Sequence, residues 1–245
     1  GLTWISTGQL DVAKRVLRRT VELLREPVRA GLPVVVLEPS CAAVFRADAP
    51  ELLPDDPDVR RLADATMTLA ECLRRYAPDW QPPRIGRRAI VQTHCHQHAV
   101  LGTDADAALL RAAHVDARAL DSGCCGLAGN FGFEVGHYDV SLACAERVLL
   151  PAVRGADRDT VVLADGFSCR TQIDQADTGR RAVHSAELLA LGLRGHLDGR
   201  TVDELVERPV SSPWAARAVV AAAVAAGALT AGRGLRLPSS GRSSS

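Results

Sequence analysis

The sequence predicts an α/β protein of duplicated βα units, with short and mainly parallel sheets flanked by helices, followed by a C-terminal helical extension. Short apolar runs that suit buried strands alternate with longer segments whose apolar residues recur at helical spacing. Such alternation is typical of βαβ crossovers. Apolar residues make up 47% of the chain and aromatic residues only 4%. This composition favours helices packed on a buried sheet over an all-β sandwich.

The first half of the chain predicts a helix, a strand and a second helix. Residues 10–30 carry apolar side chains at helical spacing, and Gly31 follows as a stop signal. The apolar run 33–37 is the expected strand. A Pro-rich loop leads to a helix expected over residues 58–75, after which three prolines break the chain.

The second half predicts three strands and three helices. Strands are expected at residues 88–92, 115–120 and 160–164. Helices are expected at residues 103–113, 138–153 and 182–193, the first with a capping start at Thr103 to Asp106.

An internal repeat supports the division into halves. Residues 10–41 align without gaps to residues 138–169, and both windows run helix, turn, strand, Ser-Cys. We therefore expect half-domains at residues 1–86 and 87–195, a helical extension at 196–236 and a disordered tail at 237–245. Gly1 corresponds to Gly126, so we also expect the chain to begin inside its own first motif, with an equivalent cysteine pair before Gly1.

The charge balance and the number of cysteines argue against two classes of protein, those that bind nucleic acid and small secreted disulfide scaffolds. Acidic and basic residues balance at 29 each, which argues against a nucleic-acid partner. Seven cysteines are odd in number and too few for a small secreted disulfide scaffold, so we expect a reducing interior.

The location is expected to be cytoplasmic, or peripheral to the inner face of the membrane. The Ala-rich stretch 215–231 falls short of a membrane span and is expected to be a peripheral helix.

Four cysteines follow the predicted strands of the second half. Because the carboxyl ends of parallel strands meet at one edge of a sheet, these thiols are expected to converge there. Soft thiolate ligands suit an iron-sulfur cluster or tetrahedral zinc, and an adjacent pair favours a cluster of several irons. The alternative is that they are small buried hydrophobes, which we prefer for Cys72 and Cys144 inside helices. The candidate ligands are Cys95, Cys124, Cys125 and Cys169, with Cys41 at the equivalent place in the first half.

Four further residues are expected beside the ligands. In an extended segment His94, His96 and His98 would share one face, which leaves a mixed Cys and His site open. For His94 and His96, and more strongly for His98, we favour hydrogen bonding to cluster sulfur or capping of the loop over ligation. Gly126 would permit close backbone approach to a cluster, and Asp165 could orient ligands from the same sheet edge.

Five segments carry a resemblance to a known family. They are His94-Cys95-His96-Gln97, the run 121–129 around Cys124-Cys125-Gly126, Phe131-Gly132-Phe133-Glu134, His137-Tyr138, and the run 164–170 ending in Ser168-Cys169-Arg170. They resemble the C-terminal cysteine-rich (CCG) region of FAD-linked, iron-sulfur D-2-hydroxyacid dehydrogenases of the D-lactate and D-2-hydroxyglutarate type. Related domains occur in the iron-sulfur subunits of glycolate oxidase, anaerobic glycerol-3-phosphate dehydrogenase and heterodisulfide reductase. The match covers residues 1–193.

The resemblance implies electron transfer. It implies that Cys95, Cys124, Cys125 and Cys169 are the ligands of a complete half-site, with a cluster of the 4Fe-4S type, and that Cys41 belongs to the half without its cysteine pair. It also implies upstream flavin and ferredoxin-like domains or subunits, FAD in the flavin domain, and an electron acceptor such as a quinone or a carrier protein. Since the chain has neither a ferredoxin ligand run nor a flavin domain, it should not oxidise a substrate alone.

The sequence is also compatible with two other functions. Cys124 and Cys125 could form a reducible disulfide and support thiol redox chemistry without metal. Alternatively, the chain could be a non-catalytic docking module that binds a partner through the Ala-rich stretch 215–231.

Overall fold

The computed structural model describes residues 1–195, 197 and 200–205. The strands are β1 (Val34–Val35), β2 (Thr66–Met67), β3 (Arg88–Val91), β4 (Asp116–Ala119), β5 (Val161–Leu163) and β6 (Ala182–Val183). The helices are α1 (Leu2–Ser6), α2 (Leu10–Arg29), α3 (Pro39–Ala43), α4 (Ala49–Leu52), α5 (Pro57–Ala65), α6 (Leu69–Tyr76), α7 (Asp104–Ala112), α8 (Tyr138–Glu146), α9 (Leu149–Gly155), α10 (Phe167–Gln175), α11 (Ser185–Leu193) and α12 (Val202–Leu205). Single turns of π-helix and of 3-10 helix are η1 (Val44–Asp48), η2 (Gln97–Leu101) and η3 (Phe131–Phe133).

The strands form two parallel sheets. In the first half β1 pairs with β2. In the second half the strand order is β4-β3-β5-β6, and every neighbouring pair is parallel. The predicted fold class is therefore confirmed: short parallel sheets are flanked by helices.

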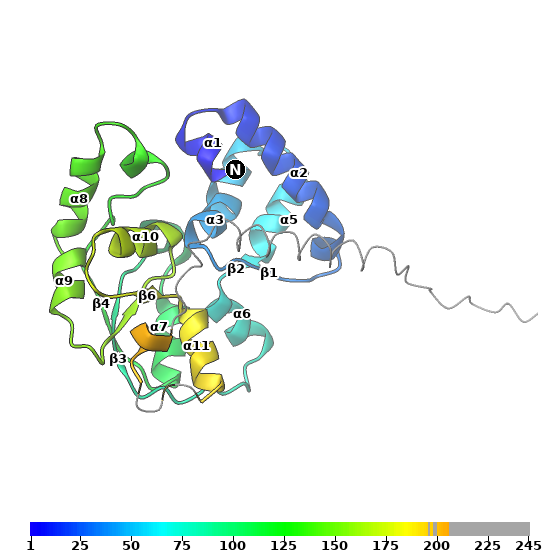
Figure 1. Ribbon diagram of the computed structural model, residues 1–245. Coiled ribbons are helices and arrows are strands. Elements are labelled where there is room, and N and C mark those ends of the chain that lie inside the picture. Colours follow the sequence, from blue (N-terminus) through cyan, green and yellow to red (C-terminus); the bar gives the residue numbers. More distant parts are fainter. Residues whose placement is uncertain (196, 198–199, 206–245) are drawn as a thin grey trace, which may run out of the picture. The chain divides into compact units, whose positions relative to one another are not determined.

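Helices cover both faces of the four-stranded sheet because its residues alternate between two cores. Ala89 and Leu163 face the core that contains α7 and α11. Ile90 and Val162 face the core of α8, α9 and α10. Figure 1 shows α8 and α9 on one side of this sheet and α7 with α11 on the other.

The order of the four strands creates a switch point between β3 and β5. From β3 the chain passes through α7 to β4 on one side, and from β4 it returns through α8 and α9 to β5 on the other side of β3. The connections that follow β3 and β5 therefore run to opposite sides, towards β4 and β6. Between them, at the carboxyl ends of these two strands, such a topology forms a crevice. In open α/β sheets, ligands bind in such a crevice beyond the carboxyl ends of the strands.

The first half has its own core, in which α2 packs on α5 through Leu17 and Leu62. Asp58, on α5, is only 8% exposed and forms ion pairs with Arg29 and Arg61 at 2.9 and 2.8 Å. Burial opposes ionisation of this carboxyl, yet the hydrogen bonds from the two guanidinium groups hold its pKa below the ordinary range.

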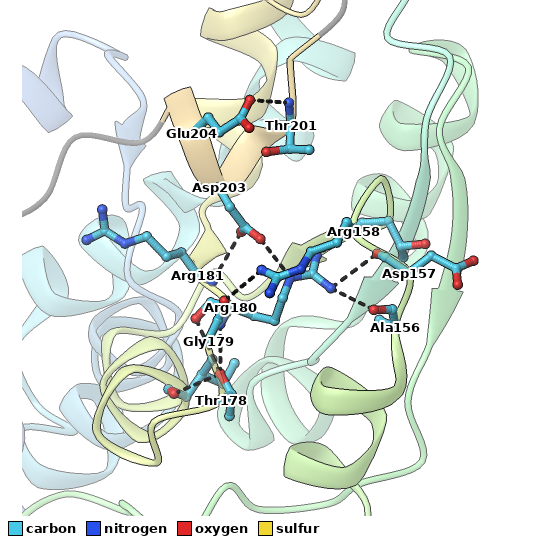
Figure 2. Close-up of polar contacts among 12 residues, drawn as sticks. Ala156, Asp157, Arg158, Thr178, Gly179, Arg180, Arg181, Thr201, Asp203 and Glu204 are labelled. Atoms are coloured by element: carbon cyan, nitrogen blue, oxygen red, sulfur yellow. Dashed lines mark hydrogen bonds and ion pairs between the residues drawn. The ribbon is translucent and has the colours of Figure 1, made fainter.

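The buried side chain of Arg180 connects α12, the last described helix, to the four-stranded sheet by hydrogen bonds (Figure 2). Arg180 is 6% exposed, and its guanidinium donates to Asp203 of α12 at 2.7 Å. It also donates to the backbone carbonyls of Ala156, Asp157 and Thr160, all in the segment that leads into β5. We call this group the Arg180 latch. All three guanidinium nitrogens of Arg180 thus donate hydrogen bonds, which offset the cost of burying the charge.

The helix predicted over residues 58–75 is wrong, because β2 divides it. Thr66 is β-branched, pairs with Val34 of β1, and donates its hydroxyl proton to the carbonyl of Leu62 at the end of α5. Thr68 and Glu71 then form a capping box that starts α6. That Thr-x-x-Glu signature was visible in the sequence.

The helix predicted over residues 138–153 is also interrupted. Pro151 has no N–H to bond the carbonyl of Arg147, so α8 ends at Glu146 and α9 begins at Leu149. The helix predicted over residues 182–193 begins late, because Ala182 and Val183 form β6 and α11 starts only at Ser185.

The repeated windows share their order of elements. Each runs through helix and strand into a further helix, α3 or α10, whose third residue is Cys41 or Cys169. The half-domain boundaries stay a prediction. Most of the expected extension at 196–236, the stretch 215–231 within it, and the tail at 237–245 lie outside the described residues. Among the described residues, none of the helices is long and apolar enough to cross a membrane.

Candidate metal centre

The four candidate ligands lie on the loops that follow three neighbouring strands. Cys95 follows β3, the pair Cys124 and Cys125 follows β4, and Cys169 lies in the first turn of α10 after β5. Since β4, β3 and β5 are adjacent and parallel, their loops meet at one edge of the sheet. The cysteines thus lie at the carboxyl edge of the sheet, on the two strands that border the switch point and on the neighbouring strand β4.

The thiols interact with one another. Cys124 interacts with Cys125 and with Cys95, Cys125 interacts with Cys169, and the charges of Cys95 and Cys169 also act on each other. Cys125 and Cys169 are buried at 4% and 1% exposure, whereas Cys95 and Cys124 are half-buried. All seven cysteines of the chain are free thiols. The four candidate ligands therefore lie close enough to affect one another, and their ligation of a metal stays a prediction.

Proton sharing among these thiols favours a thiolate at Cys124. Hydrogen bonds from Cys125 and then from Cys95 lower the pKa of Cys124, and the backbone N–H of Gly126 donates to the same sulfur at 3.3 Å. The same bonds to Cys124 raise the pKa of both Cys95 and Cys125. Cysteine binds metal as the thiolate, and these contacts favour that form at Cys124.

The donor set fits an iron-sulfur cluster better than a single ion. Four sulfur donors arrive from three loops, and such clusters are held by four cysteine thiolates. The N–H of Gly126 on Cys124 is the kind of outer contact that orients a ligand and tunes a metal site.

The segment after β3 is helical rather than extended, so the expectation that three histidines share one face is wrong. Cys95 and His96 begin a turn that continues as η2, and the N–H of His98 donates to the carbonyl of His94 at 3.0 Å. The rings of His94 and His96 stack with centroids 5.3 Å apart, while His98 is exposed.

Both ring nitrogens of His94 are engaged in hydrogen bonds. Nδ1 accepts from the backbone N–H of His96 at 3.2 Å, so Nε2 of the neutral ring carries the proton and donates to Ser168 Oγ at 3.3 Å. The side chain is 4% exposed, and burial lowers its pKa. These contacts suit a hydrogen-bonding role. The ligand atoms of His94, Cys95 and His96 nevertheless lie within 4.8 Å of one another, which keeps a mixed site as the geometric alternative.

Gly126 is required by a close backbone approach. It has φ +93°, and a Cβ at this position would lie 2.1 Å from the carbonyl oxygen of Ser141 on α8. The close approach is thus to a helix, while its N–H reaches the Cys124 sulfur.

The remaining predicted residues lie elsewhere. Asp165 accepts hydrogen bonds from the backbone N–H and the hydroxyl of Ser185 at the start of α11, and its role beside the ligands stays a prediction. Cys41 lies on α3, where partial burial of the thiol and then the charge of Glu38 raise its pKa, and its place in a second half-site stays a prediction. Cys72 lies on α6 and Cys144 on α8, as expected of cysteines inside helices.

The helix α10, which carries Ser168 and Cys169, was not predicted from the sequence. Its helical pattern is weak, and the buried set Cys169, Gln172 and Ile173 is the signal that could have found it. Ser168 links two parts of the site, because its hydroxyl contacts His94 Nε2 at 3.3 Å and Cys125 Sγ at 3.9 Å.

Glu38 was also missed. Its carboxylate accepts a hydrogen bond at 2.7 Å from the N–H of Phe167, the first residue of α10. A cavity of about 260 Å³ lies beside the ligands and is lined in part by Glu38, Ser40, His94, Cys95, His96 and Ser168. A larger cavity of about 450 Å³ lies at the opposite ends of β3 and β4, near Arg88 and Asp116, and none of the cysteines lines it.

Comparison with known proteins identifies relatives among dehydrogenases. No family model matches the chain. One subunit of the anaerobic glycerol-3-phosphate dehydrogenase of Escherichia coli (strain K12) is 29% identical over 199 residues, which are 79% of this chain and 49% of the relative. The chain is therefore similar to a dehydrogenase component.

A second relative is a much longer protein. D-2-hydroxyglutarate dehydrogenase of Escherichia coli (strain K12) is 26% identical over 179 residues, which are 71% of this chain and 17% of that protein. The chain therefore spans about half the length of the first relative and a small part of the second. Both similarities fall within the enzyme groups that the sequence motifs resembled.

Proposed function

We propose that this chain is the iron-sulfur electron-transfer region of a larger oxidoreductase, with Cys95, Cys124, Cys125 and Cys169 as the ligands of a 4Fe-4S cluster. The observation that carries the proposal is that these four thiols follow three adjacent parallel strands at the carboxyl edge of one sheet, close enough to shift one another's pKa. The similarity to two dehydrogenases supports the oxidoreductase part.

A bound cluster would supply one-electron transfer. The protein's own groups would hold and shield it. Cys125 and Cys169 are buried and keep water from one side, while the half-buried Cys95 borders the cavity. The Gly126 N–H and the Ser168 hydroxyl lie against ligand sulfurs, where hydrogen bonds stabilise negative charge.

The complete enzyme would oxidise a hydroxy compound in another domain or subunit. By similarity the substrate is D-2-hydroxyglutarate or glycerol 3-phosphate. The resemblance of the sequence motifs adds other D-2-hydroxy acids such as D-lactate. We propose FAD in that upstream part, ferredoxin-like domains as relays, and a quinone or a carrier protein as the acceptor. The chain itself would transfer electrons and would not oxidise the substrate.

Anaerobic reconstitution with iron and sulfide tests the proposal. We expect a brown protein whose iron and sulfide contents are nearly equal and whose reduced form gives a cluster EPR signal. Cys124→Ser and Cys169→Ser should lose most of the signal, because each removes a ligand. The matched controls Cys72→Ser and Cys144→Ser, inside α6 and α8, should keep the wild-type content. A wild-type protein that binds no iron under these conditions would refute the cluster.

Metal-free thiol chemistry is the second candidate, favoured by the low pKa of Cys124 beside the Cys125 thiol. Alkylation followed by mass spectrometry measures the number of free thiols under oxidising and reducing conditions. A loss of two thiols confined to the peptide 124–125, in a protein that binds no iron, would establish this alternative. An unchanged thiol count would exclude it.

A further inference from the structure

Glu38 is a single carboxylate that caps two helices, one in each half of the chain. One oxygen accepts from the hydroxyl of Ser40 at 2.8 Å and from its backbone N–H at 3.4 Å, at the start of α3. The other oxygen accepts from the N–H of Phe167 at 2.7 Å, at the start of α10. These two helices occupy equivalent places in the internal repeat.

A local cap for α10 is sterically excluded. The residue before Phe167 is Gly166, and a Cβ at this position would lie 2.2 Å from Cδ2 of the His94 ring. Side chains that normally cap a helix, those of Ser, Thr, Asp and Asn, all need that Cβ. An N-cap side chain would in any case accept from the second or third N–H of the helix. The first N–H of α10, that of Phe167, has Glu38 of the other half of the chain as its acceptor.

The start of α10 sets two contacts of the candidate site. Ser168, the second residue of the helix, contacts His94 Nε2 and Cys125 Sγ. Cys169, the third residue, is 1% exposed and interacts with Cys125. A shift of this helical turn would move both side chains relative to the other ligands.

The position of Glu38 is itself fixed by its neighbour. The carbonyl oxygen of Leu37 accepts a hydrogen bond from His184 Nε2 at 2.8 Å. Residues 37 and 38 are thus bonded to two elements of the second half, at the starts of α10 and α11.

The carboxylate also brings charge to the site. Glu38 lines the same cavity as His94 and Cys95, and its charge opposes the effect of burial on the pKa of His94. A nearby negative charge makes the addition of an electron less favourable, so it lowers a reduction potential.

We propose that Glu38 is a positioning residue of the metal centre: it holds the first turn of α10, with Ser168 and Cys169, from the opposite half of the chain, and its charge lowers the reduction potential of the site. The second clause rests on the proposed function. The first concerns the protein alone and holds with or without a metal.

Hydrogen exchange in the metal-free, full-length protein tests the positioning role. Glu38→Ala removes both acceptors, so exchange at the Phe167 amide should rise roughly tenfold to a hundredfold, as expected for loss of one hydrogen bond to a charged group. The amide of Val162, in the central strand β5, should exchange as in the wild type. No change at Phe167, or an equal rise at Phe167 and Val162, would overturn the role.

Redox titration of the reconstituted protein tests the charge. Glu38→Gln should give a more positive midpoint potential than the wild type, and Glu38→Asp, which keeps the charge, should lie near the wild type. Glu26→Gln removes the same charge from the exposed face of α2 and should cause no shift. Equal potentials in Glu38→Gln and the wild type would refute the tuning role. If no cluster assembles in the wild type, both the effect of Glu38 on the reduction potential and the proposed function are refuted. The positioning role of Glu38 is then still tested by the hydrogen-exchange experiment.

Discussion

At the scale of single residues, two glycines on either side of the cysteine pair differ in what surrounds them. Gly123 and Gly126 both have positive φ, at +62° and +93°. A Cβ on Gly123 would meet nothing within 4 Å, whereas one on Gly126 would meet the backbone of Ser141 at 2.1 Å. A φ in this region costs a non-glycine residue about 1–2 kcal/mol. Only Gly126 adds a collision that a side-chain movement cannot relieve.

We therefore predict that Gly126→Ala lowers the free energy of unfolding by about 3 kcal/mol or more, since overpacking adds about 1–3 kcal/mol to the conformational cost. Gly123→Ala should lower it by about 1 kcal/mol. Urea denaturation of the metal-free protein measures both. Equal losses would mean that the contact with Ser141 does not constrain the loop.

Asp106, in the first turn of α7, gives the stability a pH dependence. Burial, followed by the charges of Asp165 and Glu71, raises the pKa of its carboxyl to about 6, and the Gln97 side chain opposes this shift in part. The folded state thus binds a proton that the unfolded chain, with a pKa near 3.9, releases earlier. The contribution of Asp106 is present below about pH 4 and is lost as the pH rises through 6.

Asp106→Asn removes the titration. The variant should match the wild type near pH 4 and exceed its free energy of unfolding by roughly 1–3 kcal/mol at pH 8, on the basis of the shift in pKa. Denaturation curves at several pH values measure the difference. A difference that stays constant with pH would show that Asp106 does not titrate in this range.

At the scale of elements, the Arg180 latch is the main polar connection of α12 to the sheet (Figure 2). Its guanidinium bonds one carboxylate and three backbone carbonyls from the segment before β5. Arg180→Leu should destabilise the protein by about 3–5 kcal/mol, because it leaves Asp203 without its buried counter-charge. The matched change Arg158→Leu, at an exposed arginine bonded to the Gly179 carbonyl, should stay within about 0.5 kcal/mol. Similar effects of the two changes would contradict the latch.

The elements also show what the sequence can predict. The helix α2 is evident because its buried residues Ala13, Leu17 and Val21 recur at helical spacing. The strands β3 and β5 are evident as apolar runs because their apolar residues are buried in the cores on both faces of the sheet. The two-residue strand β2 was not predicted, because it is defined by its pairing with β1, which is a tertiary contact. α10 escaped because three buried positions in nine residues leave little periodic signal.

At the scale of the whole molecule, the convergence of the four cysteines could be predicted because their place after the strands depends only on topology. The contact between Glu38 and Phe167 could not. It joins residues that are 129 positions apart, and nothing in the local pattern of either segment indicates the other. The same holds for the Ser168 hydroxyl, whose contact with His94 depends on how α10 packs.

The central claim is that these four thiols hold an iron-sulfur cluster in an electron-transfer region. Native mass spectrometry of the anaerobically reconstituted chain tests it most directly, because the mass gained counts the bound atoms. We predict a mass increase equal to four irons and four sulfides, absent from Cys124→Ser and Cys169→Ser and retained in Cys72→Ser. A spectrum that shows only the metal-free protein, or one bound zinc ion, would contradict it.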